Sequence, residues 1–389
     1  MKRSLGIAVL ALAVAAPAAS SSAPSAPGVP QPPPAVAGVP VYLAVDLGSH
    51  QVLAAHDADR AFLPASMTKV MTAYVAFELM AQGKLKAEQV FTVRPETAAT
   101  WQNRGTGMRL RVGEQVPVDT LLHGIATISA NDGCVVLAEG ATGSVAAWLA
   151  LMNAEARRLG MTHSHFGTPN GWPDGGATHV SADDMVKLGE ALIARHPVLY
   201  HRYFGKKAIL WHGMEQESHD PTVGVVPGAD GVKTGHTRES GYSFLGTAIR
   251  DGRRIMIVIG GATSEAQRTQ ASRELLEWGF SAWEARPLFA RGAVVGQAGV
   301  QEGDARQVPL VARDGVGVTV PRGTHPQVTA TLRYRGPLVA PIAKGAEVAQ
   351  LELAVPGQPV ARVPLVAGAS VAKAGPLDRL VNGLAGLLP

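Results

Sequence analysis

Three short polar motifs follow one another in this chain of 389 residues, and their residue types fit one kind of chemistry. They are Ser66-Met67-Thr68-Lys69, Ser129-Ala130-Asn131 and Lys233-Thr234-Gly235. A serine hydroxyl is a weak nucleophile until a neighbouring base takes its proton, and a lysine that is desolvated beside a second cation can be neutral enough to do so. The motifs together predict a serine that becomes covalently acylated.

The first motif can supply both the nucleophile and the base. If residues 65–82 are helical, Ser66 and Lys69 are three residues apart and lie on the same face of the helix. Ser66 would also lie at the helix N-terminus, where free N–H groups and the helix dipole favour a developing negative charge. Lys233 is the candidate for the second cation that keeps Lys69 neutral.

The elements that must position these motifs are two strand hairpins and a helix. Residues 41–47 and 51–55 read as strands before the helix, which carries apolar residues at helical spacing. Residues 241–249 and 253–260 form a second pair around Asp251-Gly252, a strong hairpin signal. Lys233-Thr234-Gly235 leads into that pair. We expect Gly235 to let another backbone, that of a peptide substrate, approach an edge strand closely.

With these motifs, the chain resembles the low-molecular-mass penicillin-binding proteins that act as serine-type D-alanyl-D-alanine carboxypeptidases. The same motif set, with Ser-Asp-Asn in second place, is also found in class A β-lactamases. The resemblance covers about 240 residues and includes the following further stretches: Pro64 to Thr72, Ser129 to Asp132, Phe166 to Gly171, Ser181 to Met185, Gly231 to Thr237, Gly241-Tyr242 and Arg268 to Phe280. It implies an α+β catalytic domain, an antiparallel sheet with helices on both sides, followed by a small all-β domain.

The resemblance also implies how the acyl enzyme forms. Ser66 would be the nucleophile and Lys69 the general base. Asn131 would hold the substrate amide, and the backbone N–H groups of Ser66 and His236 would form the oxyanion hole. The acyl group would come from a peptidoglycan stem peptide ending in D-Ala-D-Ala during cell-wall maturation, and penicillin and other β-lactams would acylate the same serine.

Departure of the terminal D-alanine is assigned to other residues by the same resemblance. Ser129 and Lys233 would relay a proton to the leaving amine. Thr234 and Arg268 would receive the terminal carboxylate, and a guanidinium suits that task because it can bind a carboxylate with two hydrogen bonds. Gly235 completes the substrate-binding strand. The family pattern has leucine where this chain has Trp172, so we expect a differently shaped loop there.

Two other functions share some of these features. A serine β-lactamase would use the same acylation step, but a class A enzyme needs a glutamate to activate water, and no convincing Glu-x-x-Leu-Asn element lies between the second and third motifs. A non-catalytic cell-wall binding protein is disfavoured, because every residue with a proposed chemical role is present.

The N-terminal sequence predicts export. Lys2-Arg3, an apolar run from Leu5 to Ala16 and small residues after it indicate a signal peptide over residues 1–19. A Pro/Ser/Ala-rich linker follows over 20–40. Removing Lys2 and Arg3 lowers the formal net charge from +4 to +2, and no basic helix with interleaved aromatic residues appears, so we expect no nucleic-acid binding. The expected location is the periplasm, at the outer face of the inner membrane.

Composition divides the remaining chain into three parts. Residues 41–285 are the predicted catalytic domain. Residues 286–372 are rich in Val, Pro and Gly in short apolar runs, which predicts a small antiparallel β domain. Residues 373–389 place leucines at helical spacing behind Pro376 and predict an amphipathic membrane anchor, with packing on the β domain as the alternative.

Two other features suggest chemistry but have simpler interpretations. Cys134 is the only cysteine, so no intrachain disulfide can form, and we interpret it as a buried packing residue. His163 and His165 could be two metal ligands, but no further cluster completes a site, so we prefer a polar turn there. We interpret Ser181 as the cap of a following helix. Neither a metal nor a cofactor is implied.

Overall fold

The computed structural model describes residues 5–10 and 28–375, which form two compact units. The larger unit comprises residues 32–47 and 53–280. The β unit comprises residues 48–52, the chain from 281 to 375 and the described residues before 32. The segment 376–389, with most of the predicted membrane anchor, lies outside the described residues, as do 1–4 and 11–27 of the predicted signal peptide and linker.

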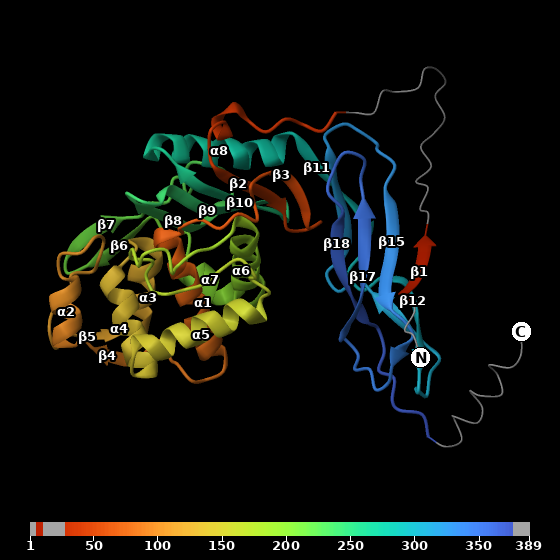
Figure 1. The fold of residues 1–389 in the computed structure, drawn as a ribbon, viewed down its shortest axis with the longest axis horizontal. Coiled ribbons are helices and arrows are strands. Elements are labelled where there is room, and N and C mark those ends of the chain that lie inside the picture. The colour runs from red at the N-terminus through yellow and green to blue at the C-terminus, as the bar shows by residue number, and fades with distance from the viewer. Residues whose placement is uncertain (1–4, 11–27, 376–389) are drawn as a thin grey trace, which may run out of the picture. The chain divides into compact units, whose positions relative to one another are not determined.

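An antiparallel sheet of five strands is the centre of the larger unit (Figure 1), in the order β3-β2-β10-β9-β8. Its strands are β2 (Val41–Asp46), β3 (Gln51–His56), β8 (Ala229–Thr237), β9 (Gly241–Arg250) and β10 (Arg253–Ala262). Both predicted hairpins are confirmed. Asp251 and Gly252 have φ values of 49° and 78°, as the expected two-residue turn requires. Lys233 pairs with Leu245 in β9, so the third motif lies on the edge strand β8.

Helices cover both faces of this sheet (Figure 1). The helix α8 (Glu265–Ser281) lies on one face, where Gly279 adjoins Ile255 of β10. On the other face α6 packs against β2 and β10. The remaining helices of the larger unit are η1 (Pro34–Val36), η2 (Ala65–Thr68), α1 (Lys69–Ala81), α2 (Pro95–Trp101), α3 (Val118–Thr127), α4 (Asn131–Thr142), α5 (Val145–Arg158), α6 (Ala182–Arg195) and α7 (Pro197–Tyr203).

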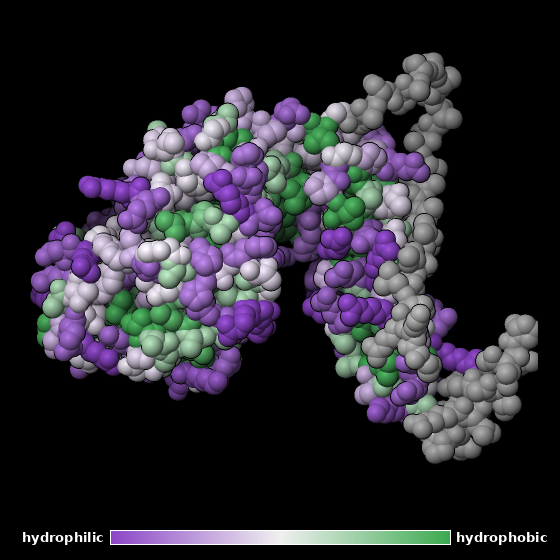
Figure 2. All heavy atoms as spheres, viewed as in Figure 1, coloured by the Kyte–Doolittle hydropathy of each residue, from purple (hydrophilic) through white to green (hydrophobic). Residues whose placement is uncertain are grey.

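Two small hairpins complete the larger unit. They are β4 (Val90–Thr92) with β5 (Gln115–Pro117), and β6 (Ala208–Trp211) with β7 (Met214–Glu217). The predicted cap of α6 is confirmed, because Ser181 Oγ accepts a hydrogen bond from the Asp184 N–H at 3.2 Å. Hydrophilic and hydrophobic residues are mixed over the visible face of this unit in the space-filling view (Figure 2).

The helix that carries the first motif is a core helix. Every residue from Lys69 to Phe77 is buried, as expected of a helix that is apolar on all sides. The predicted helix over 65–82 was wrong in its first turn, which is the 3₁₀ helix η2 and follows a left-handed Ala65 with φ 46°. Within the described residues no single helix could span a membrane by length and hydropathy; α4 and α5 pass together but meet at 92°.

The C-terminal part of the β unit is all-β, as predicted, and the strand β1 (Leu5–Leu10), which falls within the predicted signal peptide, pairs with β15. Its main sheet has the order β1-β15-β17-β18-β13-β12-β16, and β11 pairs separately with β14. The strands are β1 (Leu5–Leu10), β11 (Trp283–Phe289), β12 (Val294–Gln301), β13 (Gln307–Val311), β14 (Val316–Pro321), β15 (Thr329–Arg335), β16 (Leu338–Val339), β17 (Glu347–Ala354) and β18 (Ala361–Ala367). The 48–52 turn belongs to this unit, and the hydroxyls of Ser49 and Thr319 are 2.8 Å apart.

Candidate active site

The side chains of Ser66 and Lys69 meet at the start of α1. Lys69 Nζ lies 2.6 Å from Ser66 Oγ. The 3₁₀ geometry of η2 brings residues three apart almost directly over each other, so it aligns this pair more closely than an α-helical turn would. Ser66 lines the cleft of about 370 Å³ that we take as the candidate active site, whereas Lys69 is only 1% exposed and lies behind it.

Lys69 Nζ has two further partners, and neither of them can donate a hydrogen bond to it. It donates to Asn131 Oδ1 and to the backbone carbonyl of Asn170, both at 2.8 Å. A neutral amine has two N–H groups and one lone pair. Because these two acceptors use both N–H groups, the lone pair is left for the hydroxyl of Ser66. The geometry therefore fits a neutral lysine that accepts the serine proton.

Asn131 and Asn170 are themselves fixed. Asn131 Nδ2 donates to the Arg104 carbonyl at 3.2 Å, which assigns the oxygen of its amide to Lys69. Asn170 Oδ1 accepts from the Trp172 N–H at 3.0 Å. Asn131 was predicted to hold the substrate amide. In the structure its side chain already positions Lys69, with one N–H left for a substrate.

Burial lowers the pKa of both active-site lysines. The pKa of Lys69 falls from 10.5 to about 8 because the amine is desolvated, and the nearby Cys134 and Asp132 oppose this shift. The pKa of Lys233 falls to about 7, again mainly by desolvation, with Lys69 as the next cause. Desolvation and a nearby second cation were both expected to keep Lys69 neutral. Burial is the main cause, and the coupling between the two lysines is seen on Lys233.

Ser129 lines the cleft, and Lys233 is buried on β8 next to Thr234, which also lines the cleft. Lys233 is 3% exposed and its Nζ donates to the Thr234 carbonyl at 3.1 Å. Ser129 lines the cleft with a left-handed backbone, φ 63°. Within residues 28–375 its hydroxyl has no hydrogen-bond partner. It is therefore available to a bound substrate.

The positively charged end of the cleft contains Arg268. Its side chain is almost fully buried, and Nη2 donates to Glu265 Oε1 at 2.9 Å. Its buried Nε has no hydrogen-bond partner in the described part of the chain, which leaves an N–H for an anion. Thr234, His236 and His219 line the cleft as well.

Gly235 lies close to another backbone within the protein itself, whereas the expected approach of a substrate stays a prediction. A Cβ at this position would lie 2.2 Å from the carbonyl oxygen of Pro64. The backbone that approaches β8 closely is therefore the turn before Ser66. Gly171 plays a similar part with φ 75°, since its Cβ would lie 1.8 Å from the Ala65 oxygen. Because these two glycines have no side chain, the turn before Ser66 can pack closely against β8 on one side and the loop after Asn170 on the other.

Three residues that contribute to the site were not predicted from the sequence. The carbonyls of Asn170 and Arg104 act through the backbone and have no residue-type signature. His219 lines the cleft, and only its position shortly before the third motif could have suggested it.

Cys134 is buried as predicted, and burial raises the pKa of its thiol to about 12, so it is an unreactive packing residue at neutral pH.

Comparison with known proteins agrees with this geometry. Residues 30–264 match the family described as D-alanyl-D-alanine carboxypeptidase, peptidase S11, and residues 283–373 match the C-terminal domain of penicillin-binding protein 5. The chain belongs to the D-alanyl-D-alanine carboxypeptidase family. It is therefore a serine-type carboxypeptidase by family, with the α+β fold and C-terminal β domain that were expected.

Relatives of known name span nearly the whole chain. D-alanyl-D-alanine carboxypeptidase DacD of Salmonella typhimurium is 32% identical over 90% of both chains. DacA of Escherichia coli is 33% identical over 84% of this chain and 81% of its own. The crystal structure of penicillin binding protein 5 from Haemophilus influenzae has a TM-score of 0.73 and 29% identity, covering 86% of this chain and 98% of that one.

Replacing Gly235 tests the packing of the nucleophile turn. In Gly235→Ala the methyl group must displace the Pro64 carbonyl, and with it Ser66. A shift of about 1 Å can cost on the order of 100-fold in rate, so we expect a loss of that size in kcat/KM for a D-Ala-D-Ala peptide. Gly299→Ala is the control, since a Cβ there meets nothing within 4 Å. Equal activity in both variants would contradict this packing argument.

Proposed function

We propose that Ser66 attacks the carbonyl of the penultimate D-alanine in a peptidoglycan stem peptide and releases the terminal D-alanine. The observation that carries this proposal is the contact of 2.6 Å between Ser66 Oγ and the buried Lys69 amine, whose pKa is lowered to about 8. In this role Lys69 takes the serine proton as the Oγ–carbon bond forms. Asn131 and the Asn170 carbonyl keep the lone pair of that amine directed at Ser66.

The remaining site residues have roles in the later steps. We assign the oxyanion hole to the N–H groups of Ser66 and His236. The C–N bond breaks as the leaving amine receives a proton by way of Ser129 and Lys233. The carboxylate of that leaving residue is bound by Thr234 and Arg268, and the free Nε of Arg268 supports the assignment. Water then hydrolyses the ester on Ser66.

A carboxypeptidase is favoured over a β-lactamase by the acids of the cleft. Among the described residues that line it, Glu265 alone is acidic, and it is paired with Arg268. No carboxylate is thus placed beside Ser66 to activate water against a bulky acyl group. A penicillin-binding protein from Listeria monocytogenes with 28% identity has been solved in an ampicillin-bound form. We propose that β-lactams likewise acylate Ser66 and are released slowly.

Ser66→Ala tests the nucleophile. The wild type should release D-alanine from a peptide ending in D-Ala-D-Ala and should be labelled covalently by a fluorescent penicillin. Ser66→Ala should abolish both, with its circular dichroism spectrum and melting temperature unchanged. Labelling that survives the substitution would show that another residue is the nucleophile. Rapid penicillin turnover by the wild type without D-alanine release would favour the β-lactamase alternative.

The pH dependence of acylation tests the base. Below its pKa of about 8, Lys69 is protonated and cannot accept the serine proton, and the neutral fraction falls about tenfold for each further pH unit. We expect the rate of penicillin labelling to be roughly 100-fold lower at pH 6 than at its plateau above pH 8. The melting temperature measured at each pH is the control for unfolding. A rate that stays flat from pH 6 to pH 8 would argue against Lys69.

We further propose that the protein is exported to the periplasm and held at the inner membrane by residues 375–389. The apolar run after Lys2-Arg3 and the helical spacing of the C-terminal leucines support this location. Deleting residues 375–389 should move the protein from the membrane fraction to the soluble fraction without loss of D-alanine release. An unchanged membrane fraction would rule out this anchor.

A further inference from the structure

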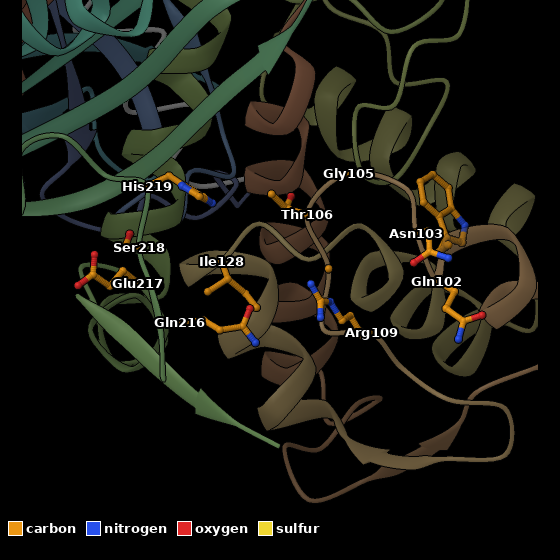
Figure 3. A pocket seen from close by; sticks show the side chains of 12 residues that line it. Gln102, Asn103, Gly105, Thr106, Arg109, Ile128, Gln216, Glu217, Ser218 and His219 are labelled. Carbon is orange, nitrogen blue, oxygen red and sulfur yellow. The ribbon is translucent and has the colours of Figure 1, made fainter. Parts of the chain in front are cut away.

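A second pocket opens beside Ser129, and none of the roles assigned above uses it (Figure 3). Its volume is about 640 Å³, and it shares Gly105, Thr106 and His219 with the active-site cleft. Thr106 Oγ1 donates to the Ser129 carbonyl at 2.8 Å, and Ile128, the neighbour of Ser129, lines the pocket. The pocket therefore joins the cleft at the end where Ser129 lies.

That end is where the leaving residue of the substrate lies, if the proposed function holds. The leaving amine meets Ser129, and its carboxylate meets Arg268. His219 stands between the cleft and the pocket, and burial together with the charges of Lys233 and Arg268 lowers its pKa. The other boundary of the pocket with the cleft is Gly105, which adjoins Trp172, and Trp172 also packs on Trp101 of the pocket wall. Because Thr106 bonds to Ser129 and His219 lies near the charges of Lys233 and Arg268, we place the pocket on the side of the leaving group.

The walls of the pocket suit a polar occupant. Gln102 and Asn103 line it from the loop after α2, and Gln216 and Ser218 line it from β7 and the residues that follow (Figure 3). A methyl group, the side chain of D-alanine, would leave such a space empty. A longer side chain that ends in hydrogen-bonding atoms would be matched by these amides and hydroxyls.

Arg109 is held in this pocket by an unusual backbone. Its φ of 57° is left-handed, which an arginine rarely adopts. The Asp132 carboxylate imposes it, accepting the N–H of Met108 at 2.9 Å and that of Leu110 at 3.1 Å. Trp211 Nε1 donates to the Met108 carbonyl at 2.9 Å. Hydrogen bonds before and after Arg109 thus fix the direction in which its side chain leaves the backbone.

The guanidinium of Arg109 is available to a ligand. Among the residues that the structure describes, it has no hydrogen-bond or ion-pair partner. In Figure 3 it points from its loop toward the part of the pocket that Ile128 and Gln216 line, whereas the carboxylate of Glu217 points away from it. Glu217 is the one acidic residue among the described residues that line the pocket, and because its carboxylate points away (Figure 3), the free arginine is suited to an anion and above all to a carboxylate.

We propose that this pocket binds the side chain of the leaving D-amino acid and that Arg109 binds a carboxylate at the end of that side chain. The enzyme then accepts stem peptides whose last residue is larger than D-alanine, with acidic residues preferred. The chemistry is unchanged. Ser66 Oγ forms the ester with the D-alanyl carbonyl, the C–N bond breaks, and the last residue leaves with a proton on its amine.

The test compares four acyl-D-Ala-D-X peptides, in which X is Ala, Glu, Gln or Leu, by the release of free D-X. We expect kcat/KM for D-Glu to exceed that for its uncharged isostere D-Gln by roughly fivefold, the effect of one partly exposed charge pair, and D-Leu to be the poorest of the three long residues. In Arg109→Asn the ratio of D-Glu to D-Gln should fall to about one. Asparagine is chosen because it tolerates the left-handed backbone. Arg109→Lys should retain part of the preference.

Arg111→Asn is the matched control, because it removes the same charge from the same loop without lining the pocket. It should keep the wild-type ratio and the wild-type rate of penicillin labelling. A wild type without preference for D-Glu over D-Gln would overturn the proposal. So would equal losses in Arg109→Asn and Arg111→Asn, or a preference that follows an acidic residue on the acyl side instead. Failure to release D-Ala from the reference peptide would refute the proposed function itself.

Discussion

The site depends on one buried amine and the three oxygens around it. Lys69 Nζ bonds to Ser66, Asn131 and the carbonyl of Asn170, which come from three segments far apart in the chain. Each of those segments is fixed by further hydrogen bonds, so the amine links them to one another. Moving any segment would leave a buried polar group without its partner, which costs about 1–3 kcal/mol. The same contacts that stabilise the fold therefore direct the lone pair at the nucleophile.

The electrostatics of the core support this arrangement. Lys69 and Lys233 are both buried, yet neither forms an ion pair in the described residues. Asp132 is close enough to act on Lys69, but its two oxygens accept backbone N–H groups and stay with the loop. The lysines consequently cannot both remain charged without a large desolvation cost. Their pKa values fall instead, and a base is obtained at neutral pH without a histidine.

The parts of the site that depend on side-chain type could be predicted from the sequence. The three motifs, the two hairpins and the cap at Ser181 are local signals, and the structure contains all of those elements. Interactions made by backbone atoms could not be predicted. The Asn170 carbonyl that binds Lys69 could belong to any residue type, and nothing in the sequence indicated that Gly235 adjoins the Pro64 carbonyl. Such contacts arise only when distant segments are packed together.

Strained backbone conformations are another feature of the site that could not be predicted from the sequence. Left-handed backbones are found at Ala65 beside the nucleophile, Ser129 in the cleft and Arg109 in the second pocket, although none of these residues is a glycine. Each such conformation costs roughly 1–2 kcal/mol. The residue type at these positions does not predict it. At Ser129, the carbonyl accepts a bond from Thr106, and the next N–H donates to the Gly124 carbonyl at 3.1 Å. Because these bonds hold the strained turn, the Ser129 hydroxyl is in place before a substrate arrives, and binding does not have to supply that ordering.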